Sequence, residues 1–172
     1  MDSDPTPGPG SSATNDLLAE IDEILQRRSR SQRQLAEDSA ERDTHRAEFL
    51  EDFAAVCERE VRPTMEAALG HLRQNGGGGL IQERGGSIGV TPRVTLWMSL
   101  EGEIYGSPRQ DRHPYLQLDA DAVKGQVEVS EGDMWQGAGT HTSGRARSWQ
   151  LSEITKETVS QTIVAILRRA AT

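Results

Sequence analysis

The feature that most constrains this chain is a run of 45 residues, from Asp16 to Glu60, that contains neither glycine nor proline. Both residues disfavour the interior of a helix, glycine because it loses the most backbone entropy and proline because it lacks the N–H group. A run of this length without either residue predicts one long helix. We therefore expect a helical segment over residues 15–75, with a kink near Pro63 and a shorter helix after it.

A heptad pattern runs through this segment, and its apolar residues gather at the two ends. Polar side chains hold five of the seam positions between residues 28 and 46, whereas a stable two-stranded coiled coil needs an apolar seam throughout. The start of the helix is therefore expected to contact a protein partner or a second copy of the chain, and its end, residues 49–57, to pack on the remainder of the chain. The residues expected to make the first contact are Leu18, Ile21, Leu25 and Leu35.

The sequences on either side of the helical segment predict weakly ordered chain. Residues 1–14 mix Pro, Gly, Ser, Thr and Asp, which is typical of a disordered tail. Four consecutive glycines at 76–79 follow the expected helix end and precede a strand-like sequence. A phosphate-binding loop needs the opposite order, strand, glycines and then helix. We therefore interpret residues 76–79 as a flexible joint and not as a nucleotide site.

After these glycines the hydrophobic period changes from about 3.6 to 2, which indicates strands. Val94, Leu96 and Met98 alternate with polar or aromatic residues, and the same alternation recurs near 115–121 and 126–130. A last helical pattern covers residues 155–170. The sequence thus predicts an α+β fold in which a long, coiled-coil-like N-terminal helix precedes a head at 80–172. The head is an antiparallel sheet of four or five strands covered by a C-terminal helix.

Composition and charge exclude several classes of function. The formal net charge is −8, and an acidic chain is a poor candidate for nucleic-acid binding, which depends on neutralising phosphates. The single cysteine, Cys57, excludes an internal disulfide and any site with several cysteine ligands. No apolar run approaches a membrane span and no secretory signal pattern is present, so we expect a cytoplasmic protein. The ratio of 17 Arg to 2 Lys suggests GC-rich, bacterial coding.

One stretch of the head has the composition of a ligand-binding loop. Residues 139–149 combine glycines, hydroxyl side chains, a histidine, two arginines and a terminal tryptophan, and arginine forks with backbone N–H groups suit a phosphate or carboxylate. The candidate ligand-binding residues are His141, Arg145, Arg147 and Trp149. The other reading of this stretch is a mobile hairpin loop with solvated arginines.

No spacing of His, Asp, Ser or Cys matches a catalytic or metal-binding pattern, so neither an enzyme nor a metal or cofactor site is expected. The first hypothesis is a non-enzymatic interaction or adaptor module that forms a homodimer or binds a protein partner through its N-terminal helix. The alternative is a small domain that binds an anionic ligand through the 139–149 loop, with the helix serving only to dimerise.

Overall fold

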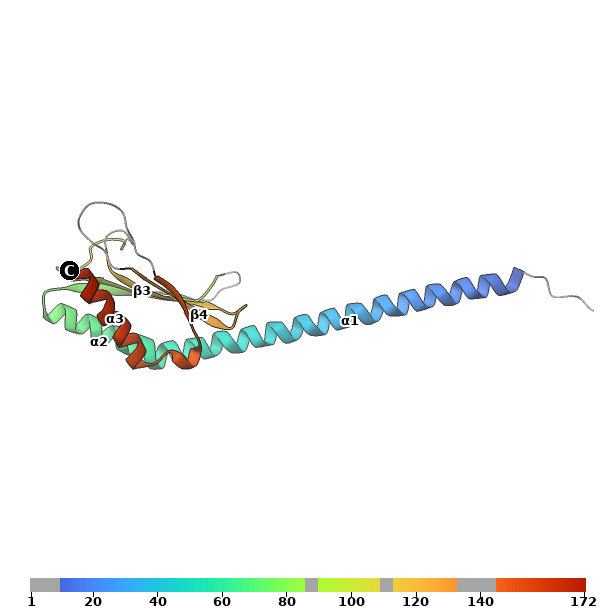
Figure 1. The fold of residues 1–172 in the computed structure, drawn as a ribbon, viewed down its shortest axis with the longest axis horizontal. Helices are drawn as coiled ribbons and strands as arrows, with labels where there is room; N and C mark the ends of the chain where they lie inside the picture. Colours follow the sequence, from blue (N-terminus) through green and yellow to red (C-terminus); the bar gives the residue numbers. More distant parts are fainter. Residues whose placement is uncertain (1–9, 86–89, 109–112, 133–144) are drawn as a thin grey trace, which may run out of the picture. The chain divides into compact units, whose positions relative to one another are not determined.

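The computed structural model describes residues 10–85, 90–108, 113–132 and 145–172, with the backbone alone at 10–17 and 145. It has the predicted α+β architecture, a long N-terminal helix followed by a five-stranded antiparallel sheet and a C-terminal helix (Figure 1). The elements are α1 (Gly10–Val56), the π-helical turn η1 (Cys57–Val61), α2 (Arg62–Gln74), β1 (Gly78–Arg84), β2 (Arg93–Ser99), β3 (Tyr115–Asp121), β4 (Gln126–Gly132), β5 (Arg145–Trp149), the 3-10 turn η2 (Leu151–Glu153) and α3 (Lys156–Ala170).

The chain divides into two compact units, Met1–His45 and Arg46–Thr172, and the boundary falls inside α1. Residues 46–74 therefore belong with the sheet, whereas the sequence placed the start of the head at residue 80. The reason is that the last turns of α1, and then α2, each have an apolar side that the sheet buries. The helix also begins at Gly10, earlier than the predicted residue 15.

Pro63 widens the helix instead of ending it. Residues Cys57–Val61 form a π turn, in which the N–H group of Arg62 donates to the carbonyl oxygen of Cys57, five residues back. A proline ring clashes with the carbonyl four residues before it in a regular α-helix. The wider π turn relieves that clash, and Pro63 then occupies the first turn of α2, where its missing N–H group costs nothing.

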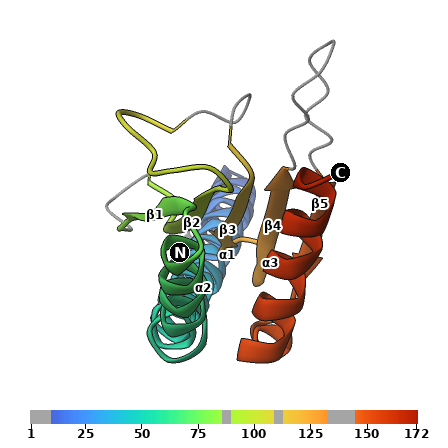
Figure 2. The same cartoon turned by 90° about the vertical axis from the view of Figure 1, so that its left-hand side faces the viewer.

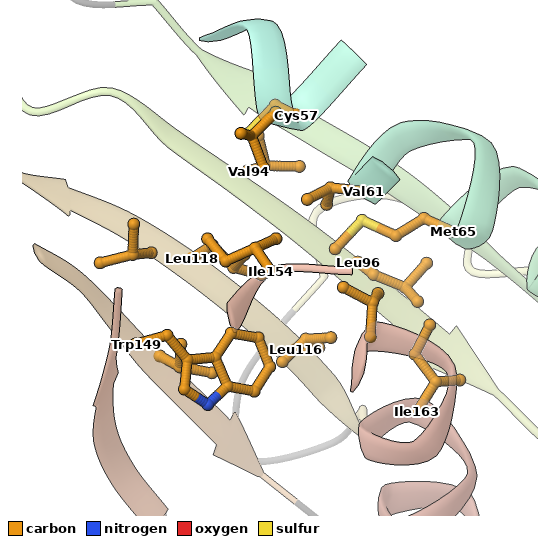
Figure 3. Close-up of a cluster of buried hydrophobic side chains, with 14 of the residues drawn as sticks. Cys57, Val61, Met65, Val94, Leu96, Leu116, Leu118, Trp149, Ile154 and Ile163 are labelled. Carbon is orange, nitrogen blue, oxygen red and sulfur yellow. The ribbon is translucent and has the colours of Figure 1, made fainter. Parts of the chain in front are cut away.

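The sheet is a simple meander in the order β1-β2-β3-β4-β5, and every neighbouring pair is antiparallel. Its inner face carries the alternating aliphatic residues that the sequence identified, and α2 and α3 both lie against that face (Figure 2). A close-up of this core shows side chains from η1, α2, the strands and α3 meeting one another (Figure 3). The fully buried large side chains are Val61, Met65, Leu96, Met98, Leu116, Leu118, Val127, Val129, Val159 and Ile166.

Several side chains on the outer face of the sheet are buried as well. Trp97 and Tyr115, which are register partners on β2 and β3, are only 7% and 5% exposed, and their ring centroids lie 5.3 Å apart. The indole Nε1 of Trp97 donates to Oε1 of Gln82 at 2.9 Å. Gly132 makes room for the Tyr115 ring, because a Cβ there would lie 2.3 Å from its Cε1 atom. Aromatic pairing thus gives the second face its own apolar layer.

Three of the four glycines at 76–79, Gly77, Gly78 and Gly79, lie in a tightly packed connection, which differs from the flexible joint that the sequence predicted. Gly78 and Gly79 are already part of β1, paired with Ser99 and Met98. A Cβ atom on Gly79 would lie 2.2 Å from the carbonyl oxygen of Trp97. Glycine is required here because the backbone of β1 approaches β2 and α2 too closely for any side chain.

This packing predicts opposite effects for two glycine-to-alanine changes. Gly79→Ala is expected to lower the free energy of unfolding by about 1–3 kcal/mol, because the new methyl group overlaps the β2 backbone. Gly70→Ala, inside α2 with no atom within 4 Å of the added Cβ, is expected to raise it by up to about 1 kcal/mol. Urea denaturation followed by circular dichroism measures both. Equal stability of the two variants would contradict the packed connection.

Candidate functional site

The first part of α1 leaves its large aliphatic side chains in solvent. All four residues of the predicted contact are exposed, Leu18 at 54%, Ile21 at 42%, Leu25 at 56% and Leu35 at 61%. Ile24, beside them, is 56% exposed. Burying such a side chain completely is worth about 1.5–3 kcal/mol. These residues, here called the helix seam (Leu18, Ile21, Leu25 and Leu35), are therefore a surface whose burial against another chain would be favourable.

The helix that carries this seam is supported by side-chain pairs one turn apart. Arg27 and Glu23 form an ion pair at 2.5 Å, and the Gln34 amide donates to Asp38 at 3.0 Å. Exposed pairs of this kind contribute about 0.2–0.5 kcal/mol each. They support the helix locally and leave the seam itself uncovered.

The residues proposed for anion binding are only partly brought together. His141 lies outside the described residues, and Arg145 begins β5 with only its backbone described. Arg147 and Trp149 lie two residues apart on β5, and the guanidinium carbon of Arg147 is 4.8 Å from the centroid of the Trp149 ring. Trp149 is 7% exposed and belongs to the core (Figure 3). Its role in the described head is therefore packing.

Arg147 is engaged inside the head by a buried carboxylate. Glu131, at the end of β4, is 3% exposed and lies 3.7 Å from the Arg147 guanidinium and 3.4 Å from that of Arg169 on α3. Arg147 also donates to Oγ1 of Thr162 at 2.8 Å. Two arginines around one buried carboxylate compensate its charge. Arg147 thus links β4, β5 and α3, and its guanidinium already has partners within the head.

Sequence reasoning missed this cluster, although one signal for it was present. Glu131 continues the inward alternation of Val127 and Val129 along β4, so its side chain had to point into the core. A carboxylate at such a position requires a cationic partner. The partner from α3, Arg169, is distant in the sequence, and its register against β4 follows only from the packing of α3 on the sheet.

Cys57 is a buried thiol without the features of a nucleophile. Burial, together with the negative charges of Glu83 and Glu58, raises the pKa of Cys57 to about 12. A reactive cysteine needs the opposite, a pKa lowered by nearby positive charge. Among the described residues, no group of three His, Cys, Asp or Glu side chains is placed to hold a metal ion.

A recess of about 370 Å³ lies beside Cys57, between the end of α1 and the strands β1 and β2. Arg62 spans it, paired with Glu58 at 2.8 Å and Glu83 at 2.7 Å, while its Nε atom has no hydrogen-bond partner among the described residues. The lining also includes Glu51, Arg84 and Arg93, so its carboxylates and its guanidiniums are equal in number. The charge of the recess therefore favours neither an anionic nor a cationic ligand.

No described helix combines the length and the apolar character that crossing a bilayer requires. Comparison with models of known protein families, with curated proteins and with solved structures gave no match to this chain.

The buried cluster predicts that Arg147 matters for stability. Arg147→Ala is expected to lower the free energy of unfolding by about 1–2 kcal/mol, because Glu131 loses one of its two cationic neighbours and Thr162 loses a donor. The effect is moderate because the Arg147 side chain is 45% exposed. The control is Arg168→Ala, at an exposed position of α3, with a change below about 0.5 kcal/mol. Urea denaturation of both variants tests this, and equal effects would contradict the structural role.

Proposed function

We propose that this protein is a non-enzymatic interaction module, which associates with a second copy or with a protein partner through the helix seam on α1. The observation that carries the proposal is the exposure of four large aliphatic side chains at heptad spacing, in a chain whose content of hydrophobic residues is low. Only 34% of the residues are hydrophobic, and the buried core already uses most of the large ones in the described head. Among the described residues, five of the nine large hydrophobic side chains that are exposed lie on the first part of one helix, which favours a contact made there.

The remaining features are consistent with this proposal. The acidic charge and the polar middle of the helix keep an exposed helix in solution without non-specific association. A single buried cysteine is what a chain of the reducing cytoplasm is expected to have. The alternative function, an anionic-ligand site, loses support because Arg147 is engaged by Glu131 and Thr162.

The proposal is tested with a charge placed on the seam and a matched charge placed beside it. Leu25→Asp puts a carboxylate on the helix seam, and Gln26→Asp puts the same group on the neighbouring exposed position, off the seam. We expect Leu25→Asp to weaken association at least about 10-fold, because a buried leucine is worth about 1.5–3 kcal/mol, and Gln26→Asp to leave it nearly unchanged. Sedimentation equilibrium measures self-association, and the full-length variants serve as bait for a partner.

Circular dichroism of both variants controls for loss of the helix. If the unmodified protein, Leu25→Asp and Gln26→Asp all bind the partner or second copy equally well, the contact is not made by the helix seam.

A further inference from the structure

The charges on α1 are arranged in blocks of alternating sign. Three acidic residues, Glu20, Asp22 and Glu23, precede a basic block of four arginines, and every one of these residues is exposed. The basic block consists of Arg27, Arg28, Arg30 and Arg33. Because this part of the chain carries −3 and then +4 within fourteen residues, the direction in which two copies pair decides whether these charges attract or repel.

In a parallel, in-register dimer, the acidic block of one helix would face the acidic block of the other, and the basic block would face the basic block. Arg28 occupies the heptad position that follows Leu25, in line with the helix seam, so it would face Arg28 of the second copy. Arg42, further along the same seam, would also face itself. Two like charges about 4 Å apart repel by about 1 kcal/mol in water and about 4 kcal/mol at a protein surface. This cost opposes the burial of the leucines.

Antiparallel pairing separates the basic blocks that parallel pairing brings together. In the register in which the two helices cross at residue 23, Arg28 of one copy and Arg28 of the other lie ten residues, or about 15 Å, apart along the axis. A seam layer then joins heptad position a of one helix to position d of the other. In the register that crosses at residue 23, Ile21 faces Leu25 of the second copy, and Leu25 faces Ile21. Ile24, exposed beside them, lies within two residues, or about 3 Å along the axis, of Ile24 of the second copy. Ile21, Ile24 and Leu25 thus lie in the centre of the contact, and Leu18 faces Arg28 of the second copy at each end of it.

The same register gives Arg28 and Asp22 a partner. Neither residue forms an ion pair with any residue that the structure describes. In the antiparallel register, Asp22 lies about four residues, or about 6 Å along the axis, from Arg28 of the second copy. An arginine side chain spans that distance. Because a two-fold contact is self-complementary, the pair forms twice.

We propose that two copies of this chain associate antiparallel through residues 18–28 of α1, with Ile21 opposite Leu25 and Asp22 paired with Arg28. This inference rests on the proposed function, of which it specifies the partner as a second copy and the orientation as antiparallel. It does not involve the head.

The orientation is measured with pairs of spin labels in the full chain. Cys57 is first replaced by Ala, and single cysteines are then introduced as Ala40→Cys or Gln26→Cys, both at exposed positions off the seam. The Gln26 labels lie within about 25 Å of each other in either orientation, because only about six residues separate them along an antiparallel axis, so they report dimer formation. The Ala40 labels lie about 34 residues apart in the antiparallel register, which corresponds to about 50 Å.

Pulsed electron paramagnetic resonance is expected to give a short Gln26 distance and an Ala40 distance near 50 Å. An Ala40 distance near 20 Å, with the Gln26 distance also short, would show a parallel dimer, which overturns this inference while the proposed function stands. A distance near 40 Å would show antiparallel pairing displaced by one heptad, which overturns the Ile21–Leu25 register. The absence of a short Gln26 distance would mean that no dimer forms through the seam, which overturns self-association.

A matched charge reversal tests the ion pair independently. Asp22→Arg should weaken self-association at least several-fold, because it sets like charges together, and Asp22→Arg with Arg28→Asp should restore it. The control Asp38→Arg, outside the central contact, should change it little. Failure of the double variant to recover association would overturn the proposed pair.

Discussion

Burial of the inner face of the sheet beneath α2 and α3 is the interaction on which the rest of the head depends. The strands supply aliphatic residues at every second position, and the two helices supply Met65, Val159 and Ile166 to cover them. A meander of five strands has no covered face of its own, so neither the sheet nor the helices would be stable alone. Most of the large apolar side chains of the described chain are used in this one contact.

Continuity between α1 and α2 follows from how the chain accommodates Pro63. The π turn at Cys57–Val61 absorbs the proline without a loop, so the apolar side of α1 continues into that of α2 with only a local change of register. π turns often occur at functional sites. Here the residues inside the turn, Cys57 and Val61, are buried in the core, and the turn serves packing.

Much of the fold could be predicted from the sequence because its patterns are local. Alternation identified β2 from Val94, Leu96 and Met98, and the helical pattern over residues 155–170 identified α3. The glycines at 76–79 were misjudged because residues without side chains show no alternation. Only pairing with β2 makes Gly78 and Gly79 part of a strand.

The features that sequence reasoning missed depend on contacts between distant residues. Glu131 and Arg169 meet because α3 lies across the end of β4, and no local pattern contains that information. Trp97 and Tyr115 lie on neighbouring strands, and their mutual packing buries both. The helix seam was the opposite case, since its heptad spacing is a local property of one helix, and its side chains are exposed among the residues that the structure describes.

The first part of α1 is where we propose that this protein associates. The most direct test is the molar mass in solution, by light scattering, of the full chain and of a chain that begins at Glu48. The account predicts twice 18.9 kDa for the full chain and a monomer for the shortened one. A shortened chain that remains a dimer would place the contact in the head and contradict the claim.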